Sequence, residues 1–398
     1  MTHRRPALVL LSLLIVVGVA FGSRGVQAQD QKPIIIGAPV HLTGWMAAYD
    51  GPPLLGAKLA VKKINAAGGV LGRPLQILEL DGKSETATEG NVAREVIQKG
   101  AEVLVTPCDF DMGAPAGQAA QEAGLVGISF CASSPLYGSD ALGDKQFTLS
   151  MWNQTMGAAA AQYAYEVKGW KTAATVVDQG TEYPKSLGQY FVETFKHLGG
   201  QVVSEDTYQQ NDMQASAQAQ RLKALNPQPD VVFVASQMPD YSAIIRDIRS
   251  AGVTAPLFGG DSMDTDDFYK ALGPQIGNDI YISTHSFIGP QTGPEMEQFI
   301  KDFQAEYGRP PEVAFNAMGW DTVQVIAQGI TKAKGTDGAA LAKALEGTEF
   351  SLLSGKLVWT DAAKGHFPDK EAFIVEVKSG KPTFVQRLKP GWTPDIGG

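Results

Sequence analysis

The segment Cys108–Gly113, CDFDMG, places two carboxylates on either side of a phenylalanine. It follows the apolar run AEVLVTP and precedes APAGQAAQEAG, which has a helical pattern. The acids therefore lie at a predicted turn from strand to helix. Two carboxylates at such a turn could hold a metal ion, transfer protons, meet a cationic ligand or cap the helix. The segment alone leaves these roles open.

Residue patterns that would support catalysis are missing from the sequence. It contains no G-x-S-x-G elbow, no Walker or dinucleotide glycine loop, and no H-E-x-x-H or C-x-x-C pair. The five histidines are scattered, and a hydrogen-bonded structural role suits His41, which follows a predicted strand. We therefore expect no enzyme activity, no metal and no cofactor. A secreted hydrolase is the remote alternative.

The acidic segment 261–267, DSMDTDD, suggests calcium at first sight, but it lacks the alternating order and the glycine of a calcium loop. Asp264, Asp266 and Asp267 stand near the start of the helical segment DDFYKAL, where they would face its positive end. Asp261 comes earlier, at the end of a predicted strand, and remains a candidate for a ligand cleft.

Short apolar runs alternate with helical patterns along the chain, which predicts an α/β fold. The predicted strands are 34–40, 74–80, 101–107, 124–130, 172–178, 201–208, 230–236, 256–261 and 280–285. Because helical segments separate them, we expect parallel sheets covered on both faces, arranged as two successive units. The segment 371–388 instead predicts a β-hairpin with a Ser-Gly-Lys turn.

Ligands of such sheets meet the loops at the carboxyl ends of the strands. Four aromatic residues stand in loops directly after predicted strands: Trp45, Tyr49, Phe110 and Tyr183. We predict that they form the apolar wall of a pocket between the two units.

The N-terminal sequence is typical of a secretory signal peptide. Arg4 and Arg5 precede the apolar stretch Ala7–Gly22, and the small residues around Ala28 form a cleavage pattern. We expect cleavage after Ala28, so that residues 1–28 are removed and a protein without a membrane span is released. Removing the three arginines of the signal changes the net charge from −9 to −12, and no basic cluster favours nucleic-acid binding. The two cysteines, Cys108 and Cys131, could pair in an oxidising compartment or stay as buried thiols.

Three longer motifs carry a resemblance to a known family. They are LTGWMAAYDG with GAKLAVKKINAAGGVLGRPLQILELD, then QEAGLVGISFCASSP, then AFNAMGWDTVQVIAQGI. In this order they resemble the type I periplasmic solute-binding proteins of ABC importers, in the group that binds leucine, isoleucine and valine. The resemblance spans essentially all of the mature chain.

The resemblance implies the type I periplasmic binding protein fold, with two doubly wound parallel-sheet lobes around a cleft. The lobes would comprise residues 29–150 with 285–353, and residues 151–284 with 354–398. Three crossover segments would join them, near Leu149–Trp152, Ser283–Ser286 and Leu352–Gly355. The strand order of this fold also places AEVLVTP beside GLVGISF, so that Cys108 and Cys131 would come within reach of a disulfide.

The implied function is capture of a small, amino acid-like solute in the periplasm by lobe closure. The partners would be a permease and ATPase subunits of an importer in the inner membrane, and we expect the protein to be a monomer. A sensor that reports ligand to a receptor is an alternative.

The resemblance also assigns roles to individual residues. The predicted ligand contacts are Trp45, Tyr49, Asp109, Phe110, Asp111, Ala132, Ser133, Tyr183, Gln237 and Asp261. Asp261 matches an acid that pairs with the ligand ammonium, Ser133 a hydroxyl and Ala132 a backbone carbonyl that contact the ligand.

Phe110 departs from the family, because relatives carry there a serine that receives the ligand carboxylate. This departure, with an acid on each side, motivates a second hypothesis in which the ligand is an aromatic acid, amine or amide. Asp111 could instead cap the helix that we predict to start near Met112, which is a simpler role than ligand contact.

Overall fold

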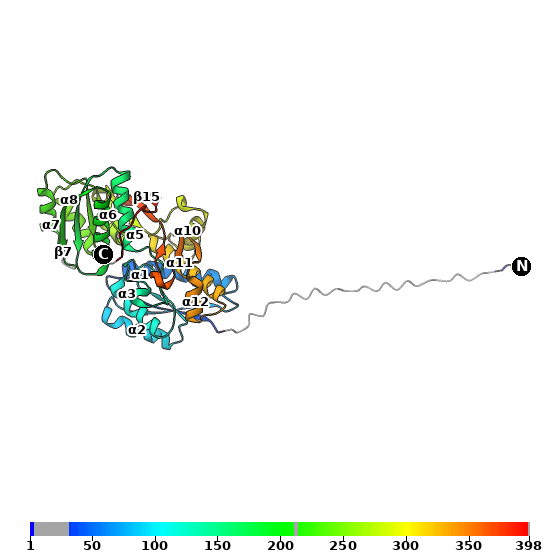
Figure 1. Cartoon of the computed structure of the whole chain (residues 1–398). Coiled ribbons are helices and arrows are strands. Elements are labelled where there is room, and N and C mark those ends of the chain that lie inside the picture. The colour runs from blue at the N-terminus through cyan, green and yellow to red at the C-terminus, as the bar shows by residue number, and fades with distance from the viewer. Residues whose placement is uncertain (4–31, 211–213, 397–398) are drawn as a thin grey trace. The chain divides into compact units, whose positions relative to one another are not determined.

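The computed structural model describes residues 1–3, 32–210 and 214–396 (Figure 1). The described residues from Lys32 onward form one compact unit. The predicted signal peptide and its cleavage site fall, apart from residues 1–3, outside the described residues. In the described part of the chain, no helix is long and apolar enough to cross a membrane.

The first half of this unit is built on a parallel five-stranded sheet with the order β2-β1-β3-β4-β5. Its strands are β1 (Ile34–Val40), β2 (Leu75–Asp81), β3 (Val103–Thr106), β4 (Gly127–Ser129) and β5 (Gln146–Thr148). The helices between them are α1 (Ala47–Ala66), α2 (Thr86–Gln98), α3 (Phe110–Glu122) and α4 (Ser139–Leu142). The central strands are apolar and buried because both faces of the sheet are covered.

The second sheet has seven strands in the order β15-β14-β10-β9-β8-β6-β7. They are β6 (Thr172–Asp178), β7 (Gln201–Tyr208), β8 (Val231–Ala235), β9 (Leu257–Gly259), β10 (Ile280–Thr284), β14 (Ala372–Lys378) and β15 (Lys381–Leu388). Its helices are α5 (Asn153–Gln162), α6 (Glu182–His197), α7 (Ser216–Ala224), α8 (Asp240–Ser250) and α9 (Asp266–Ile276). Strands β14 and β15 pair antiparallel, which confirms the predicted hairpin, and the parallel pairs in both sheets confirm the α/β class.

Three helices follow β10 and return to the first sheet: α10 (Pro294–Tyr307), α11 (Ala314–Ala333) and α12 (Gly338–Leu345). Helix α11 packs against α1 at very close range (Figure 1). A Cβ atom on Gly56 would lie 1.9 Å from the carbonyl oxygen of Asn316, and one on Gly319 would lie 1.7 Å from that of Pro53. Glycine at these two positions therefore permits the contact between the helices.

A small antiparallel sheet follows α12 late in the sequence. It consists of β11 (Glu349–Leu352), β12 (Gly355–Trp359) and β13 (Pro368–Asp369). Trp359 donates its indole N–H to the carbonyl of Thr148 at 2.8 Å, which attaches this sheet to the end of β5. The boundary predicted between residues 353 and 354 thus falls in the turn between two paired strands, and the chain joins the seven-stranded sheet only at β14.

Lys370, just after β13, is buried where several segments meet. Its Nζ donates to the carbonyl of Leu149 at 3.0 Å and to Ser354 Oγ at 2.8 Å. The carboxylate of Asp321 accepts the backbone N–H of Leu353 and of Ser354. Burial lowers the pKa of Lys370 to about 8, and the charge of Asp321 opposes that shift. This polar cluster connects the segment after β5 to the turn between β11 and β12.

Candidate functional site

A small cavity lies among loops at the carboxyl ends of strands from both large sheets. It is lined by Met46, Tyr49, Cys108, Asp109, Tyr183, Gln237, Asp261, Ser262 and Phe315. Its volume is about 10 Å³, room for roughly one water molecule. Among the described residues, no three His, Cys, Asp or Glu side chains stand close enough together to hold a metal ion.

Asp109 is the N-cap of α3 and also reaches the second sheet. One carboxylate oxygen accepts the backbone N–H of Met112 at 3.2 Å, and the other accepts Nε2 of Gln237 at 2.9 Å. The side chain is 2% exposed. Burial, followed by the neighbouring charge of Asp111, raises the pKa of Asp109 to about 7. Asp109 thus links the two sheets.

The predicted capping role of Asp111 is wrong for its own helix, because α3 begins earlier, at Phe110, and Asp109 caps it. Asp111 instead accepts the backbone N–H of Glu182, the first residue of α6, at 2.8 Å. An acid at this position compensates the unpaired N–H groups and the positive end of α6. Asp111 therefore caps α6, a helix of the seven-stranded sheet.

Asp261 lies at the centre of a buried polar group. Its Oδ1 accepts the phenolic hydroxyl of Tyr183 at 2.7 Å, and its Oδ2 lies 2.8 Å from Nε2 of His285. His285 directly follows β10 and is fully buried. His285 was not among the predicted site residues, although its position at the end of a predicted strand could have pointed to it. The described partners of this carboxylate are thus a tyrosine and a histidine.

Tyr49 crosses from α1 to the loops of the second sheet. Its hydroxyl accepts the backbone N–H of Met238 at 2.7 Å and donates to the carbonyl of Ser262 at 3.2 Å. Its ring meets Trp45 and Phe315 edge-on, with centroids 6.3 Å and 6.0 Å away. Burial raises the pKa of Tyr49 well above its usual value, so the phenol stays protonated.

Asp264 forms a third contact between the halves. Its Oδ2 accepts the N–H of Ala314, the first residue of α11, at 3.1 Å, while Tyr269 donates to its Oδ1 at 2.7 Å. The expectation that Asp264 serves the DDFYKAL helix is therefore wrong, since Thr265 caps that helix. Burial raises the pKa of Asp264 to about 6. Asp266 and Asp267 do lie in the first turn of α9, as expected.

Five residues of the predicted set are not among those that line the cavity: Trp45, Phe110, Ala132, Ser133 and Asp111, whose contact with α6 is described above. Phe110 packs edge-on against Tyr137, with centroids 6.4 Å apart. Ala132 is buried, and its carbonyl accepts the hydroxyl of Thr148 at 2.7 Å. Ser133 is buried and its hydroxyl has no hydrogen-bond partner within the described part of the chain. Trp45 is half-buried behind Tyr49.

Five predicted residues do come together around the cavity: Tyr49, Asp109, Tyr183, Gln237 and Asp261. Met46, Ser262 and Phe315 also line the cavity and were not predicted from the sequence. Phe315 belongs to the motif AFNAMGWD, but only the folded chain brings the start of α11 to these loops.

Cys108 and Cys131 form a disulfide, with their Cα atoms 4.4 Å apart. The bond joins the loop after β3 to the loop after β4, which are neighbouring strands. Cys108 also donates its backbone N–H to Asp50 at 2.9 Å, and Asp50 accepts that of His41 at 2.8 Å. The buried carboxylate of Asp50 thus holds the ends of β1 and β3 against α1.

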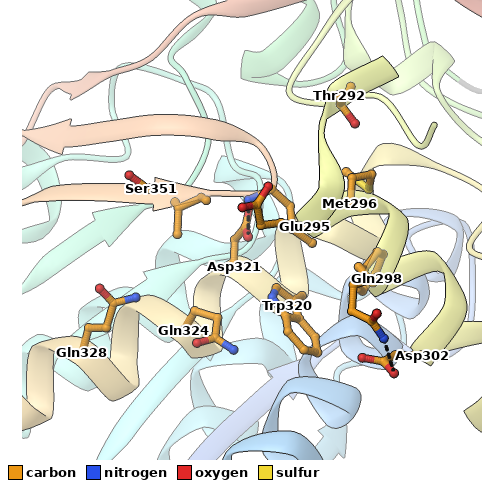
Figure 2. Close-up of a pocket in the computed structure, with 13 residues that line it drawn as sticks. Thr292, Glu295, Met296, Gln298, Asp302, Trp320, Asp321, Gln324, Gln328 and Ser351 are labelled. Carbon is orange, nitrogen blue, oxygen red and sulfur yellow. Dashed lines mark hydrogen bonds between the residues drawn. The ribbon is translucent and has the colours of Figure 1, made fainter. Parts of the chain in front are cut away.

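A larger cavity of about 590 Å³ lies between α10, α11 and β11. Figure 2 shows its polar side chains, with Gln298 donating to Asp302 at 3.1 Å. Met296, Phe299 and Trp320 form its apolar part. None of the predicted site residues lines it, and it touches no strand end of the seven-stranded sheet. We therefore take the smaller cavity between the sheets as the candidate site.

The chain is similar to known proteins in sequence and in fold. Residues 33–382 match the model of the family described as periplasmic binding protein. The Leu/Ile/Val-binding protein homolog 1 of Brucella melitensis is 25% identical over 359 residues, covering 89% of this chain and 94% of the relative.

Two solved structures share the fold. The branched-chain amino acid transporter substrate-binding protein LivJ of Streptococcus pneumoniae, in complex with isoleucine, has a TM-score of 0.81 and 25% identity, covering 90% of this chain and 100% of that one. An ABC transporter solute-binding protein from R. palustris, in complex with benzoate, has a TM-score of 0.78 and 24% identity, covering 91% and 98%. The predicted type I fold is thereby confirmed.

Proposed function

Because the chain belongs to the periplasmic binding protein family, it is the substrate-binding component of an ABC transporter, and we propose that it holds its solute in the cavity around Tyr49, Asp109 and Asp261. The observation that carries this proposal is that one cavity collects side chains from segments that follow strands of both large sheets. A solute held there would be contacted from both sides at once, which is what capture by closure requires.

The solute is a small organic molecule of amino acid-like size. Support comes from the relatives, whose names include Leu/Ile/Val-binding protein and whose structures include complexes with isoleucine and with benzoate. In this chain Tyr49, Tyr183 and Phe315 would contact its apolar part. Asp261 would pair with its ammonium group, and Gln237 would meet a further polar atom.

Solute entry requires the two sheets to move apart, because a volume of about 10 Å³ cannot hold an amino acid. We place one lobe at residues 29–150 with 285–369 and the other at 151–284 with 370–398. The small sheet β11-β12-β13 supports this change of the third crossing from residues 352–355 to Lys370. The polar cluster around Lys370 would then lie at the hinge.

The expected site of action is the periplasm, after cleavage of the signal peptide behind Ala28. The protein would act there as a monomer without catalysis of its own. It would deliver the solute to a permease and its ATPase subunits, which would distinguish the closed, loaded form from the open one.

A ligand screen tests the proposal. Amino acids, aromatic acids, amines and amides are added to the protein, and the thermal unfolding midpoint is measured, followed by calorimetry on each compound that raises it. A compound at a hundredfold excess over its dissociation constant stabilises the protein by about 2.7 kcal/mol.

Asp261→Asn should weaken binding of each such compound that carries an ammonium group by about tenfold, through loss of a charge-assisted hydrogen bond. Asp267→Asn, an exposed acid in α9, is the matched control and should bind normally. An ammonium compound that binds wild type and Asp261→Asn equally would remove this cavity as the site. A screen without any stabilising compound would contradict the proposed function.

A further inference from the structure

Three helices around the candidate site begin against a carboxylate of the chain itself. Asp109 accepts an N–H of the first turn of α3, Asp111 accepts the first N–H of α6, and Asp264 accepts the first N–H of α11. The start of a helix is a favourable place for an anion, because its N–H groups are unpaired and its dipole is positive there. At these three helices the chain's own acids already occupy that place.

The acidic side chains that line the cavity are carboxylates, and one of them, Asp261, already meets His285. The residues that line it include two carboxylates, Asp109 and Asp261, which are 2% and 4% exposed, and no lysine or arginine. The described partners of Asp109 are the uncharged N–H groups of Met112 and Gln237. A buried charge is costly unless it is paired. A ligand carboxylate would add a further negative charge here, whereas a cation would neutralise an existing one.

The apolar side of the cavity also suits a cation. Tyr49, Tyr183 and Phe315 present aromatic rings to the same small volume that the two acids reach. Aromatic faces attract ammonium and amidinium groups in addition to offering apolar contact.

We propose that the solute of this protein is an organic amine or amino amide without a free carboxylate, whose N–H groups face Asp109 and Asp261. The inference rests on the proposed function, since it assumes that the cavity between the sheets is the solute site. In this arrangement Asp109 faces the position that the carboxylate of a zwitterionic amino acid would occupy. Asp109 therefore determines which solutes bind.

Matched ligands that share one side chain test this directly. The aliphatic set is 3-methylbutylamine, leucinamide, leucine and 4-methylpentanoate, and the aromatic set is 2-phenylethylamine, phenylalaninamide, phenylalanine and 3-phenylpropanoate. Dissociation constants are measured by calorimetry on the intact mature protein. In at least one set the amine or amino amide should bind about tenfold or more tightly than the corresponding amino acid. The compounds that carry only a carboxylate should bind weakest.

Asp109→Asn isolates the charge, because asparagine caps helices as well as aspartate does and the fold should be retained. The variant should bind the preferred amine about tenfold or more weakly, while the Asp267→Asn control binds it like wild type.

Tighter binding of an amino acid or a carboxylic acid would overturn the inference and leave the solute-binding function intact. Amine binding that is unchanged in Asp109→Asn would likewise overturn the role of Asp109. If no compound of either set binds and the wider screen also finds none, both the inference and the proposed function fail.

Discussion

Asp109 and Asp111 are only two residues apart, yet they serve different helices. Asp109 has extended backbone angles, with φ −131° and ψ 149°, and turns its carboxylate back onto α3. Asp111 is already inside the helix, and residues two apart on a helix do not face each other. Its side chain therefore points away from that of Asp109 and reaches α6. The two acids of CDFDMG therefore make separate contacts, one to α3 and one to α6.

The raised pKa of Asp109 predicts a dependence of stability on pH. Its carboxyl has a pKa of about 7 in the folded protein and 3.8 in the unfolded chain. Between about pH 4 and pH 7 the folded protein therefore holds the proton more tightly, so the free energy of unfolding falls as the pH rises through this window. Asp109→Asn removes this contribution.

We expect the loss of stability between about pH 5 and pH 8 to be smaller in Asp109→Asn than in wild type, by about 1 kcal/mol or more. Urea unfolding at the two pH values measures it. Asp50, with a pKa raised to about 7 by burial, titrates in the same direction but is present in both proteins. Equal losses in the two proteins would show that Asp109 is not the titrating group.

At the scale of the elements, the loop between β3 and α3 is held by two attachments outside itself. The disulfide from Cys108 to Cys131 and the bond from the N–H of Cys108 to Asp50 hold it from two sides. Asp50 also holds the end of β1 through His41. Side chains at the cavity are thus placed by neighbouring strand ends rather than by the loop's own conformation, which keeps Asp109 in a defined position.

Loss of the disulfide should destabilise the protein without abolishing the fold. The bond closes a loop across a sequence separation of 23, for which the chain-entropy estimate is about 3 kcal/mol. Reductant should lower the thermal midpoint of wild type and leave the midpoint of Cys108→Ser/Cys131→Ser unchanged. A thiol assay on denatured, unreduced wild type should find no free thiols, and two would dismiss the bond.

At the scale of the whole molecule, several polar contacts at the cavity join the two sheets. Asp109 meets Gln237, Asp111 meets the start of α6, and Tyr49 meets the loops after β8 and β9. Polar contacts of this kind exchange readily with water, so they suit an arrangement that must open. The contacts around Lys370, which is buried, should change less.

Asp111→Ala should favour the open form. It leaves the first N–H of α6 without its acceptor, so we expect a larger radius of gyration by small-angle X-ray scattering in the absence of solute, and weaker solute binding. The cost in stability should be about 1 kcal/mol, the usual effect of losing a helix cap. Asp267→Ala serves as the control. An unchanged radius of gyration together with weaker binding would mean that Asp111 acts on the solute and not on closure.

The amino-acid sequence by itself predicted β1 to β4, β6 to β10, the helical segments between them, the terminal hairpin and the loops of the candidate site, but not β5 or the small sheet of β11, β12 and β13. The predicted elements depend on local patterns: apolar runs, helical spacing and the place of polar residues after strands. The acids at the strand ends, Asp109 and Asp261, could be selected for the same reason. The motif resemblance added the family and the adjacency of the two cysteine-bearing strands.

Only the tertiary structure decided which groups these residues meet. Asp111 is 71 residues from Glu182, and Asp264 is 50 residues from Ala314. Likewise, His285 and Phe315 reach the site only because the chain returns through β10 and α11. Such partners depend on how two sheets pack, and no local pattern encodes a distance between segments that far apart. For the same reason the pairing of β11 with β12, which flank the third crossover predicted at residues 352–355, is seen only in the tertiary structure.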